Sequence, residues 1–379
     1  MRIGLEGRVL TPHIGGIGRY AMQLLETLLS RAAQLWPDLE FVIFTAPQTD
    51  RALLGKARAL PCERFRRIKS TLLRSSVLLP AGVWCEQIDV FHGLDQAGIP
   101  WFFNAGKSVV TIHDVIPLVL PWAFPRRHRW VLTTALARIR KQAERVIVPS
   151  VAAAEDVVHF LAVERERISV IPMGCEARFQ PVGELTRTAA IRRRYDLPPR
   201  YILFVGTLEP RKNVTILLQA FAQVMAETPQ DDLGLVIAGG RGWGSEDYLA
   251  TVDALKLRDR VRFTGFVEDD HLPDLYRGAL LLVYPSLYEG FGLPVLEAMA
   301  CGTPVITSNR TSLPEVAGDA ALLVDPTRPE ALAAAMASIL SDSDLRQVLR
   351  AKGLARAQAF TWDAVAQQTI AIYRAVGGA

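Results

Sequence analysis

The sequence predicts an α/β protein of two domains, each built on a doubly wound parallel sheet. Short runs rich in β-branched residues alternate with longer helical patterns from end to end of the chain. This alternation is typical of βαβ units, which place parallel strands between two layers of helices. The chain has 379 residues, and 50% of them are hydrophobic, so it can bury two cores.

The first series of strand-like runs extends to residue 171. Apolar runs bounded by polar turns are expected to form buried parallel strands. The candidates are Ile3–Leu5, Glu40–Thr45, Val90–His92, Ser108–Ile112, Arg145–Pro149 and Ile168–Ile171. Helical patterns lie between them over Gly18–Leu35, Arg126–Ala143 and Ala152–Leu161.

A second series begins at residue 201, after a stretch rich in charge and proline. This stretch, residues 175–200, has little apolar periodicity and predicts a linker with a short helix near residues 187–195. The strand candidates that follow are residues 201–208, 233–239, 261–266, 279–286, 304–308 and 321–325. We therefore expect a first domain over 1–178, a linker over 179–200 and a second domain from 201 to 360.

Composition argues against several classes of protein. No apolar run is long enough to span a bilayer, and the N-terminal MRIGLEGRVL carries charge where a signal peptide needs an apolar core. The cysteines are scattered without a CxxC pair, so neither a zinc site nor a disulfide framework is expected. They are Cys62, Cys85, Cys175 and Cys301. A cytoplasmic enzyme fits these features best.

Positive charge is concentrated in the first half of the chain. Residues 1–179 contain 23 Lys and Arg against 16 Asp and Glu, whereas the rest contains 20 against 23. The basic residues cluster in RFRRIKSTLLR (64–74) and RRHRW (126–130), followed by Arg138, Arg140 and Lys141. Such clusters can attract an anionic membrane surface or a phosphorylated acceptor, or they can be the solvated face of a helix. No nucleic-acid partner is expected.

A glycine-rich turn, HIGGIGRY, precedes the first helix. Gly15 and Gly16 allow backbone N–H groups to approach phosphate oxygens at a helix N-terminus. A dinucleotide fingerprint is the rival interpretation, but the glycines come well after the first strand. The second strand also ends without an acidic residue to hold a ribose. A loop that binds nothing is the third interpretation.

His113 and Asp114 directly follow the strand candidate Ser108–Ile112. Histidine can donate a hydrogen bond to a sugar hydroxyl or a phosphate, and aspartate can accept hydrogen bonds from hydroxyls. The pair can equally form a structural hydrogen bond at the strand end. The sequence leaves these two interpretations open.

The stretch GTLEPRKN places two cations after the first strand of the second domain. Gly206 ends that strand, Arg211 and Lys212 follow in the turn, and Asn213 is positioned to cap the next helix. Adjacent arginine and lysine suit a diphosphate, because arginine donates bidentate hydrogen bonds and lysine supplies a point charge. A solvated pair of surface cations is the alternative.

The stretch EGFGLPVLEAMACG carries two carboxylates, Glu289 and Glu297, on either side of a turn. Its glycines expose backbone N–H groups, and a helix is predicted to begin near Pro294 with its positive dipole end at the same place. Glu289 is suited to accept hydrogen bonds from sugar hydroxyls, and Glu297 from a ribose diol. Either carboxylate alone could simply stabilise the helix N-terminus.

Taken together, these motifs resemble glycosyltransferase family 4 over nearly the whole chain. The resemblance rests on the Glu289–Glu297 spacing, GTLEPRKN, GGIGRY, the His113–Asp114 pair, GFV (265–267) and the terminal FTWDAVAQQTIAIYRAV. The family has the GT-B fold, in which two Rossmann-like domains face each other across a deep cleft. It retains anomeric configuration without a metal. The resemblance also implies that a final helix, residues 361–379, crosses back to the N-terminal domain.

The resemblance implies a role for each motif. Arg211 and Lys212 would hold the donor diphosphate, Glu297 the ribose and Glu289 the donor sugar, which His113 would also touch. Other implied donor contacts are Gly16, Gly206, Phe291, Gly292, Leu293 and the main chain at Val267, which would contact the base. Gly15 and Asp114 are expected on the acceptor side. No side-chain base is required, since the donor phosphate can take the acceptor's proton.

The implied substrates are a nucleotide-diphosphate sugar and a glycan acceptor. TIHDVIPLVLPWAFPRRHRW is similar to family members that transfer mannose from GDP-mannose in O-antigen or exopolysaccharide assembly. A polyprenyl-diphosphate-linked acceptor at the inner face of the cytoplasmic membrane fits the basic N-terminal half. UDP-, dTDP- and other GDP-linked donors stay open. So do an epimerase or phosphorylase of the same fold, a nicotinamide oxidoreductase and a non-catalytic sugar-binding protein.

Overall fold

The computed structural model describes residues 1–10, 15–45, 58–61, 79–96, 98, 107–123, 126–227, 232–242 and 248–378. It divides the chain into two compact units. Unit 1 contains Met1–Val119, Arg126–Gly174 and Thr361–Ala379, and unit 2 contains Leu120–Pro125 and Cys175–Phe360. The basic stretch 64–74 lies outside the described residues.

Unit 1 is built on a parallel sheet in the order β3-β2-β1-β4-β5-β6-β7. Its strands are β1 (Arg2–Gly7), β2 (Glu40–Thr45), β3 (Arg58–Pro61), β4 (Val90–Gly93), β5 (Lys107–Thr111), β6 (Arg145–Val148) and β7 (Ile168–Val170). Its helices are α1 (Gly16–Leu35), α3 (Leu79–Cys85), α4 (Ile116–Val119), α5 (Arg126–Gln142), α6 (Val151–Leu161) and α15 (Trp362–Gly377). A short 3-10 helix, η5 (Arg165–Arg167), precedes β7.

Unit 2 repeats this architecture with the order β10-β9-β8-β11-β12-β13. Its strands are β8 (Arg200–Val205), β9 (Leu233–Ala238), β10 (Val261–Gly265), β11 (Leu281–Tyr284), β12 (Val305–Ser308) and β13 (Leu322–Val324). Its α-helices are α7 (Leu185–Arg194), α8 (Val214–Glu227), α9 (Tyr248–Ala254), α10 (Leu272–Gly278), α11 (Leu293–Ala300), α12 (Leu313–Ala317), α13 (Pro329–Ser341) and α14 (Ser343–Ala357). The short 3-10 helices are η4 (Pro121–Ala123), η6 (Pro210–Lys212) and η7 (Asp269–His271).

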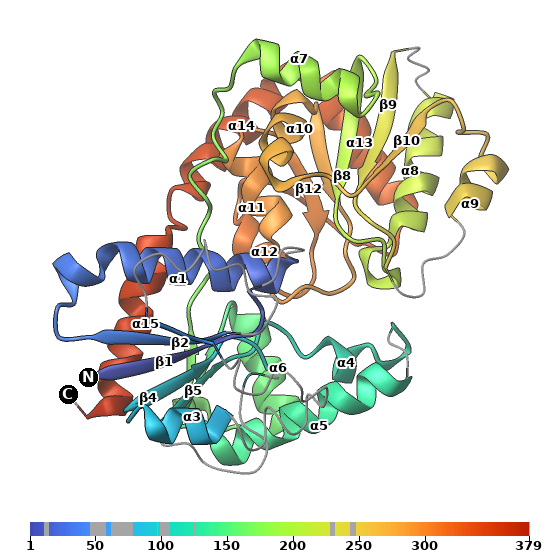
Figure 1. The fold of residues 1–379 in the computed structure, drawn as a ribbon. Helices are drawn as coiled ribbons and strands as arrows, with labels where there is room; N and C mark the ends of the chain where they lie inside the picture. The colour runs from blue at the N-terminus through green and yellow to red at the C-terminus, as the bar shows by residue number, and fades with distance from the viewer. Residues whose placement is uncertain are drawn as a thin grey trace. The chain divides into compact units, whose positions relative to one another are not determined.

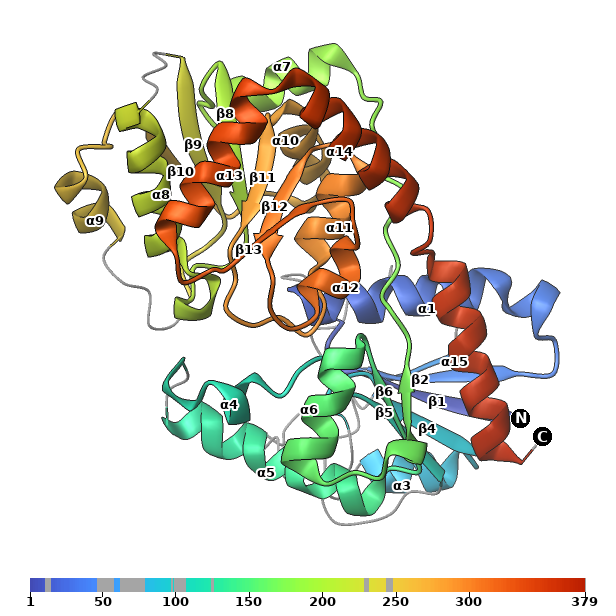
Figure 2. The same ribbon diagram turned by 180° about the vertical axis from the view of Figure 1, so that it is seen from behind.

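The sheet of unit 2 has helices on both faces, as the predicted fold class requires. Two opposite views show α8 and α13 on one face and α10 and α11 on the other (Figure 1, Figure 2). The strands β8, β9, β11 and β12 are buried almost throughout, which explains why their sequences are continuous apolar runs rather than alternating ones. The α/β class predicted from the sequence is confirmed.

In both units the strand order reverses beside the first strand of the series. In unit 1, β1 pairs with β2 on one side and β4 on the other; in unit 2, β8 pairs with β9 and β11. Loops on either side of such a reversal diverge and leave a crevice at the carboxyl ends of the strands, where ligands of doubly wound sheets bind. We therefore expect functional side chains at the carboxyl ends of the strands in each of the two sheets.

The middle of the chain differs from the sequence-based division. Residues 179–200, predicted as a linker, belong to unit 2, where Arg187 and Thr188 of α7 both donate to Asp274, a buried residue of α10. Thr361–Ala379, which contains α15, belongs to unit 1. Its Tyr373 hydroxyl lies 2.6 Å from Nδ1 of His92 on β4.

Candidate functional site

Three charged side chains predicted from separate motifs meet in unit 2. Arg211 and Lys212 lie in η6, directly after β8, and Glu289 lies in the loop after β11. Glu289 Oε1 is 2.6 Å from Lys212 Nζ and 2.9 Å from Arg211 Nη1. Lys212 is 6% exposed and Glu289 8% exposed. Because β8 and β11 flank the reversal of strand order, this cluster lies where a ligand of this sheet is expected.

Two hydroxyl groups complete the surroundings of the Glu289 carboxylate. Tyr284 donates to Oε1 at 3.0 Å and Ser286 at 2.5 Å, and Lys212 donates to the Tyr284 hydroxyl. The Lys212 ammonium also lies 4.8 Å from the centroid of the Tyr284 ring. Sequence analysis missed Tyr284 and Ser286, although both stand in the same YPSLYEG stretch as Glu289.

The charges of this cluster are balanced. Burial opposes ionisation of Glu289, but Arg211 and Lys212 outweigh it and lower the pKa of the carboxyl to about 2. Burial and the adjacent Arg211 lower the pKa of Lys212, and Glu289 counteracts them. Glu209 Oε2 accepts a hydrogen bond from Arg211 Nε at 2.8 Å. Two cations therefore face two carboxylates within the protein. An anionic ligand can bind here by replacing a carboxylate as the partner of one of the cations.

Asn213 orders the cationic turn in a way that the sequence did not predict. It adopts a left-handed backbone conformation with φ of 61°, and its side-chain amide donates to the carbonyl oxygens of Pro285 and Pro326. These two bonds use the amide nitrogen, whereas a cap would use the amide oxygen as an acceptor, so the side-chain cap expected for α8 stays a prediction. Its bond to Pro285 ties the turn after β8 to the loop after β11.

The loop that carries Glu289 ends at Gly292, which leads into α11. Gly292 has φ of 126°, and a Cβ there would lie 2.7 Å from Leu313 Cδ2, so the position requires glycine. The Ser312 hydroxyl fixes the loop by donating to the carbonyl oxygens of Phe291 and Glu289 at 2.6 and 2.9 Å. The helix begins at Leu293, one residue before the predicted start. The donor contacts expected of Phe291, Gly292 and Leu293 stay predictions.

Glu297 lies within α11 and is 2% exposed. The Tyr276 hydroxyl of α10 donates to its Oε2 at 2.8 Å. The structure therefore shows a buried carboxylate that is held by a neighbouring helix. Its predicted contact with a donor ribose stays a prediction.

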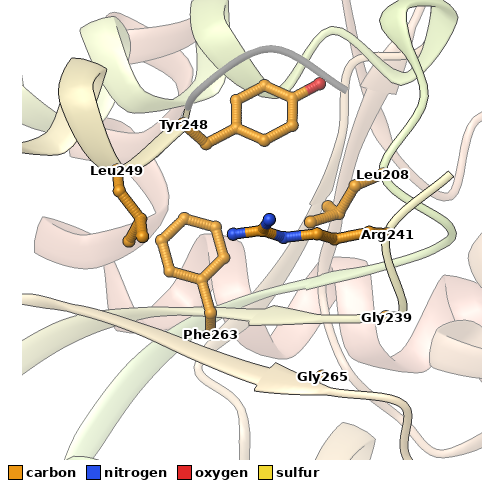
Figure 3. Close-up of a pocket in the computed structure, with 7 residues that line it drawn as sticks. All are labelled: Leu208, Gly239, Arg241, Tyr248, Leu249, Phe263 and Gly265. Atoms are coloured by element: carbon orange, nitrogen blue, oxygen red, sulfur yellow. The ribbon is translucent and has the colours of Figure 1, made fainter. Parts of the chain in front are cut away.

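A pocket of about 160 Å³ lies at the carboxyl ends of β8, β9 and β10 (Figure 3). Its walls are Leu208, Gly239, Arg241, Tyr248, Leu249, Phe263 and Gly265. A Cβ at Gly239 would overlap the carbonyl oxygen of Gly206, so close packing of two strand ends shapes this edge. Val267, predicted to contact the base, is buried two residues beyond Gly265. Sequence analysis identified neither Arg241 nor the aromatic walls.

In unit 1, the predicted phosphate contact lies at the N-terminus of α1. Gly15 is the N-cap and Gly16 the first helical residue, and both are exposed. A Cβ at either position would meet no atom of the described residues within 4 Å, at the end of a 20-residue helix. Backbone N–H groups at such an end can bind an anion.

His113 and Asp114 have different surroundings at the end of β5. His113 is buried: Nε2 is 2.9 Å from the carbonyl oxygen of Leu94, and the ring packs edge-on against Tyr20 of α1. Burial lowers the pKa of His113, so its neutral form is favoured. Among the described residues, no group is hydrogen-bonded to its Nδ1. Asp114 Oδ1 accepts from the Ile116 backbone N–H at 3.2 Å.

A charged cluster that sequence analysis did not identify lies at the same edge of unit 1. Glu6 is the last residue but one of β1, and its Oε1 is 3.3 Å from Nε of Arg8. Arg8 Nη2 in turn is 2.8 Å from Asp95 Oδ1, which follows β4. Burial raises the pKa of Glu6 to about 7, although the positive charge of the neighbouring Arg8 acts to lower it. The signal that could have found this cluster is an acidic residue inside an otherwise apolar strand.

Over the described ranges, no group of three or more His, Cys, Asp and Glu side chains is arranged to hold a metal ion. Within the same ranges, no helix is long and apolar enough to cross a bilayer.

Two family models match the chain, one in each half. The model described as Glycosyltransferase Family 4 matches residues 14–179, and the model described as Glycosyl transferases group 1 matches residues 189–356. Among curated proteins, O-antigen chain mannosyltransferase B of Escherichia coli is 32% identical over 378 residues, which cover 95% of this chain and 96% of that protein.

Solved structures show the same fold. Sucrose-phosphate synthase of Thermosynechococcus elongatus has a TM-score of 0.75 and 27% identity, with 99% of each chain covered. Anabaena HepE in complex with UDP-glucose has a TM-score of 0.76 and 20% identity, with 99% of this chain and 100% of that chain covered. The chain therefore belongs to glycosyltransferase family 4, and it is a glycosyltransferase with the two-domain GT-B fold.

Proposed function

We propose that this enzyme transfers mannose from GDP-mannose to a glycan acceptor during assembly of a surface polysaccharide such as O-antigen. The Arg211–Lys212–Glu289 cluster carries the proposal, because it places two cations and a carboxylate at the ligand edge of one sheet. The similarity to an O-antigen mannosyltransferase along nearly the whole chain supports the choice of sugar and pathway. The UDP-glucose complex of HepE supports a nucleotide-sugar donor.

Lys212 and Arg211 would stabilise the donor diphosphate. An ammonium group has three N–H donors, and the described contacts of Lys212 use two, to Glu289 and to Tyr284. The third can bind a phosphate oxygen while Glu289 keeps the ammonium in place. As the bond between the sugar carbon and the phosphate breaks, negative charge grows on the leaving group, and a preorganised cation stabilises it most in that state.

The reaction would retain configuration and require no metal. The acceptor hydroxyl would bond to the sugar carbon on the face that the phosphate leaves. A phosphate oxygen would take the hydroxyl proton, so no side-chain base is needed. Arg211 and Lys212 supply the positive charge that a metal ion supplies in other transferases. Glu289 would accept hydrogen bonds from sugar hydroxyls and oppose the positive charge that develops on the ring.

The acceptor would be linked to a polyprenyl diphosphate, with the enzyme attached peripherally to an anionic membrane. Support comes from unit 1, where Trp84 of α3 and Trp130 of α5 are 81% and 66% exposed. Arg140 and Lys141 lie in the last turn of α5. Exposed indoles and basic side chains are the groups that favour the surface of an anionic bilayer.

A transfer assay with GDP-, UDP-, dTDP- and ADP-linked sugars, with and without EDTA, tests this function. We expect transfer from GDP-mannose to a mannose oligosaccharide, unchanged by EDTA. Lys212→Ala should lower kcat by about 10²- to 10³-fold while circular dichroism shows an intact fold. Lys352→Ala is the matched control, since that lysine forms a surface pair with Asp319. Full activity in a folded Lys212→Ala variant would overturn the proposed site, and transfer from no donor would overturn the function.

A further inference from the structure

The pocket at the ends of β8, β9 and β10 has a volume and a lining that suit one flat ring system. Its volume of about 160 Å³ is below the roughly 300–1,000 Å³ of sites that enclose a whole drug-sized ligand. Leu208, Leu249 and Phe263 give it apolar walls, and the Tyr248 ring faces it from α9 (Figure 3). A nucleobase fits such a space, because its faces are apolar and its edge is polar.

Arg241 supplies the polar group of this pocket. Its guanidinium extends between the rings of Tyr248 and Phe263 (Figure 3). Within the described ranges, no side chain or carbonyl pairs with this guanidinium. Its backbone is fixed by a parallel bridge between Leu208 and Arg241, in which the Gly242 N–H donates to the Leu208 carbonyl at 3.0 Å. The side chain therefore begins from an ordered strand end and can donate to a ligand.

The pocket belongs to the same sheet edge as the cationic turn. Leu208, a wall of the pocket, lies in the sequence between Gly206, directly after β8, and Arg211 in the turn that follows. A nucleotide whose diphosphate lies at Arg211 and Lys212 can therefore reach the pocket along one connecting segment.

We infer that Arg241 selects guanine as the base of the donor, an inference that rests on the proposed function. A guanidinium presents parallel N–H donors, and guanine offers two adjacent acceptors, O6 and N7. Adenine places an amino donor beside N7, and uracil places an N–H donor beside O4, so neither accepts both hydrogen bonds. A free phosphate would leave the apolar walls of the pocket without a contact.

Calorimetric titration with nucleoside diphosphates tests the inference independently of catalysis. The probes are GDP, UDP, ADP and 7-deaza-GDP, which lacks only the N7 acceptor. We expect the wild-type protein to bind GDP on the order of ten- to a hundredfold more tightly than the other three. Arg241→Met should remove this preference by weakening GDP binding while UDP affinity stays unchanged. Arg241→Lys should restore little of the preference for GDP, because lysine keeps the positive charge but lacks the parallel N–H donors of a guanidinium.

The matched control is Arg262→Met, which removes an exposed arginine of β10 that pairs with Asp196. This variant should keep the wild-type preference for GDP. If UDP or ADP binds as tightly as GDP, or if Arg241→Met leaves the GDP to UDP ratio unchanged, the role of Arg241 is refuted while the glycosyltransferase proposal stands. If no nucleoside diphosphate binds and no sugar is transferred, both the proposed function and the inference that rests on it are refuted.

Discussion

At the scale of single residues, Glu6 shows how the fold can alter the chemistry of one group. It lies next to the last residue of β1 and is buried beside Arg8, which also pairs with Asp95. Burial favours the neutral acid and raises the pKa from 4.5 to about 7. An acid with a raised pKa stabilises the fold fully below its unfolded value, and this contribution is lost as pH rises through the folded value. The stability that Glu6 provides should therefore decline between about pH 4.5 and pH 7.

Glu6→Gln tests this assignment, because glutamine resembles the neutral acid at every pH. We expect the variant to match the wild type near pH 5 and to exceed its free energy of unfolding at pH 8 by up to about 3 kcal/mol. Urea denaturation at the two pH values measures the difference. The control is Glu40→Gln, which removes an exposed pair with Arg2 and should change stability by less than about 1 kcal/mol at both pH values. If the difference in free energy of unfolding between Glu6→Gln and the wild type does not increase from pH 5 to pH 8, the raised pKa of Glu6 is refuted.

The charged residues of unit 2 could be predicted from the sequence, but most of their partners could not. Arg211, Lys212 and Glu289 stand in short stretches whose glycines and prolines already indicate a turn at a strand end. Tyr284 and Ser286 were missed because a hydroxyl in a strand or loop gives no local sign of its partner. Arg241 was missed because its significance depends on walls contributed by α9 and β10.

At the scale of elements, local apolar patterns predicted the buried strands, while edges and long-range packing were missed. β2 was predicted with the bounds that the structure shows, since the interior of EFVIFT is an unbroken run of four apolar residues. β3, Arg58–Pro61, was not predicted: it is four residues long, ends in proline and lies at the edge of its sheet. α7 was predicted as a helix but placed in a linker. The partner that fixes it, Asp274, is 87 residues from Arg187.

The attachment of α15 to the sheet of unit 1 depends on a buried polar contact. The Tyr373 hydroxyl pairs with His92 Nδ1, and His92 Nε2 lies 2.9 Å from Thr111 Oγ1. Burial lowers the pKa of His92 to about 3, so its ring is neutral at physiological pH. Tyr373→Phe would leave a buried ring nitrogen without its partner and should lower the free energy of unfolding by about 1–3 kcal/mol.

Denaturant unfolding of Tyr373→Phe and Asp363→Asn measures this contact against an exposed one on the same helix. Asp363 pairs with Arg31 where both side chains are about half exposed, so its loss should cost less than about 1 kcal/mol. Equal effects of the two substitutions would show that the buried hydroxyl contributes nothing specific.

At the scale of the whole molecule, the chain completes unit 1 only at its end. Thr361–Ala379 returns to a unit whose other residues all precede Cys175. α15 buries five large side chains there: Trp362, Val365, Ile370, Tyr373 and Val376. At about 2 kcal/mol for each buried side chain, their loss approaches 10 kcal/mol, which is comparable to the whole stability of a typical domain.

A chain that ends at Phe360 should therefore lose the fold of unit 1 and keep that of unit 2. Hydrogen exchange with mass spectrometry can separate the two, because the strands of each unit give distinct peptides. We expect amides of β4 and β5 to exchange nearly as fast as in an unfolded chain, while β8 and β9 keep their protection. Adding the missing segment as a synthetic peptide should restore protection in unit 1 if docking of α15 is what was lost. Equal loss of protection in both units would mean that they fold as one cooperative body, and no loss in either would mean that unit 1 is stable without its final helix.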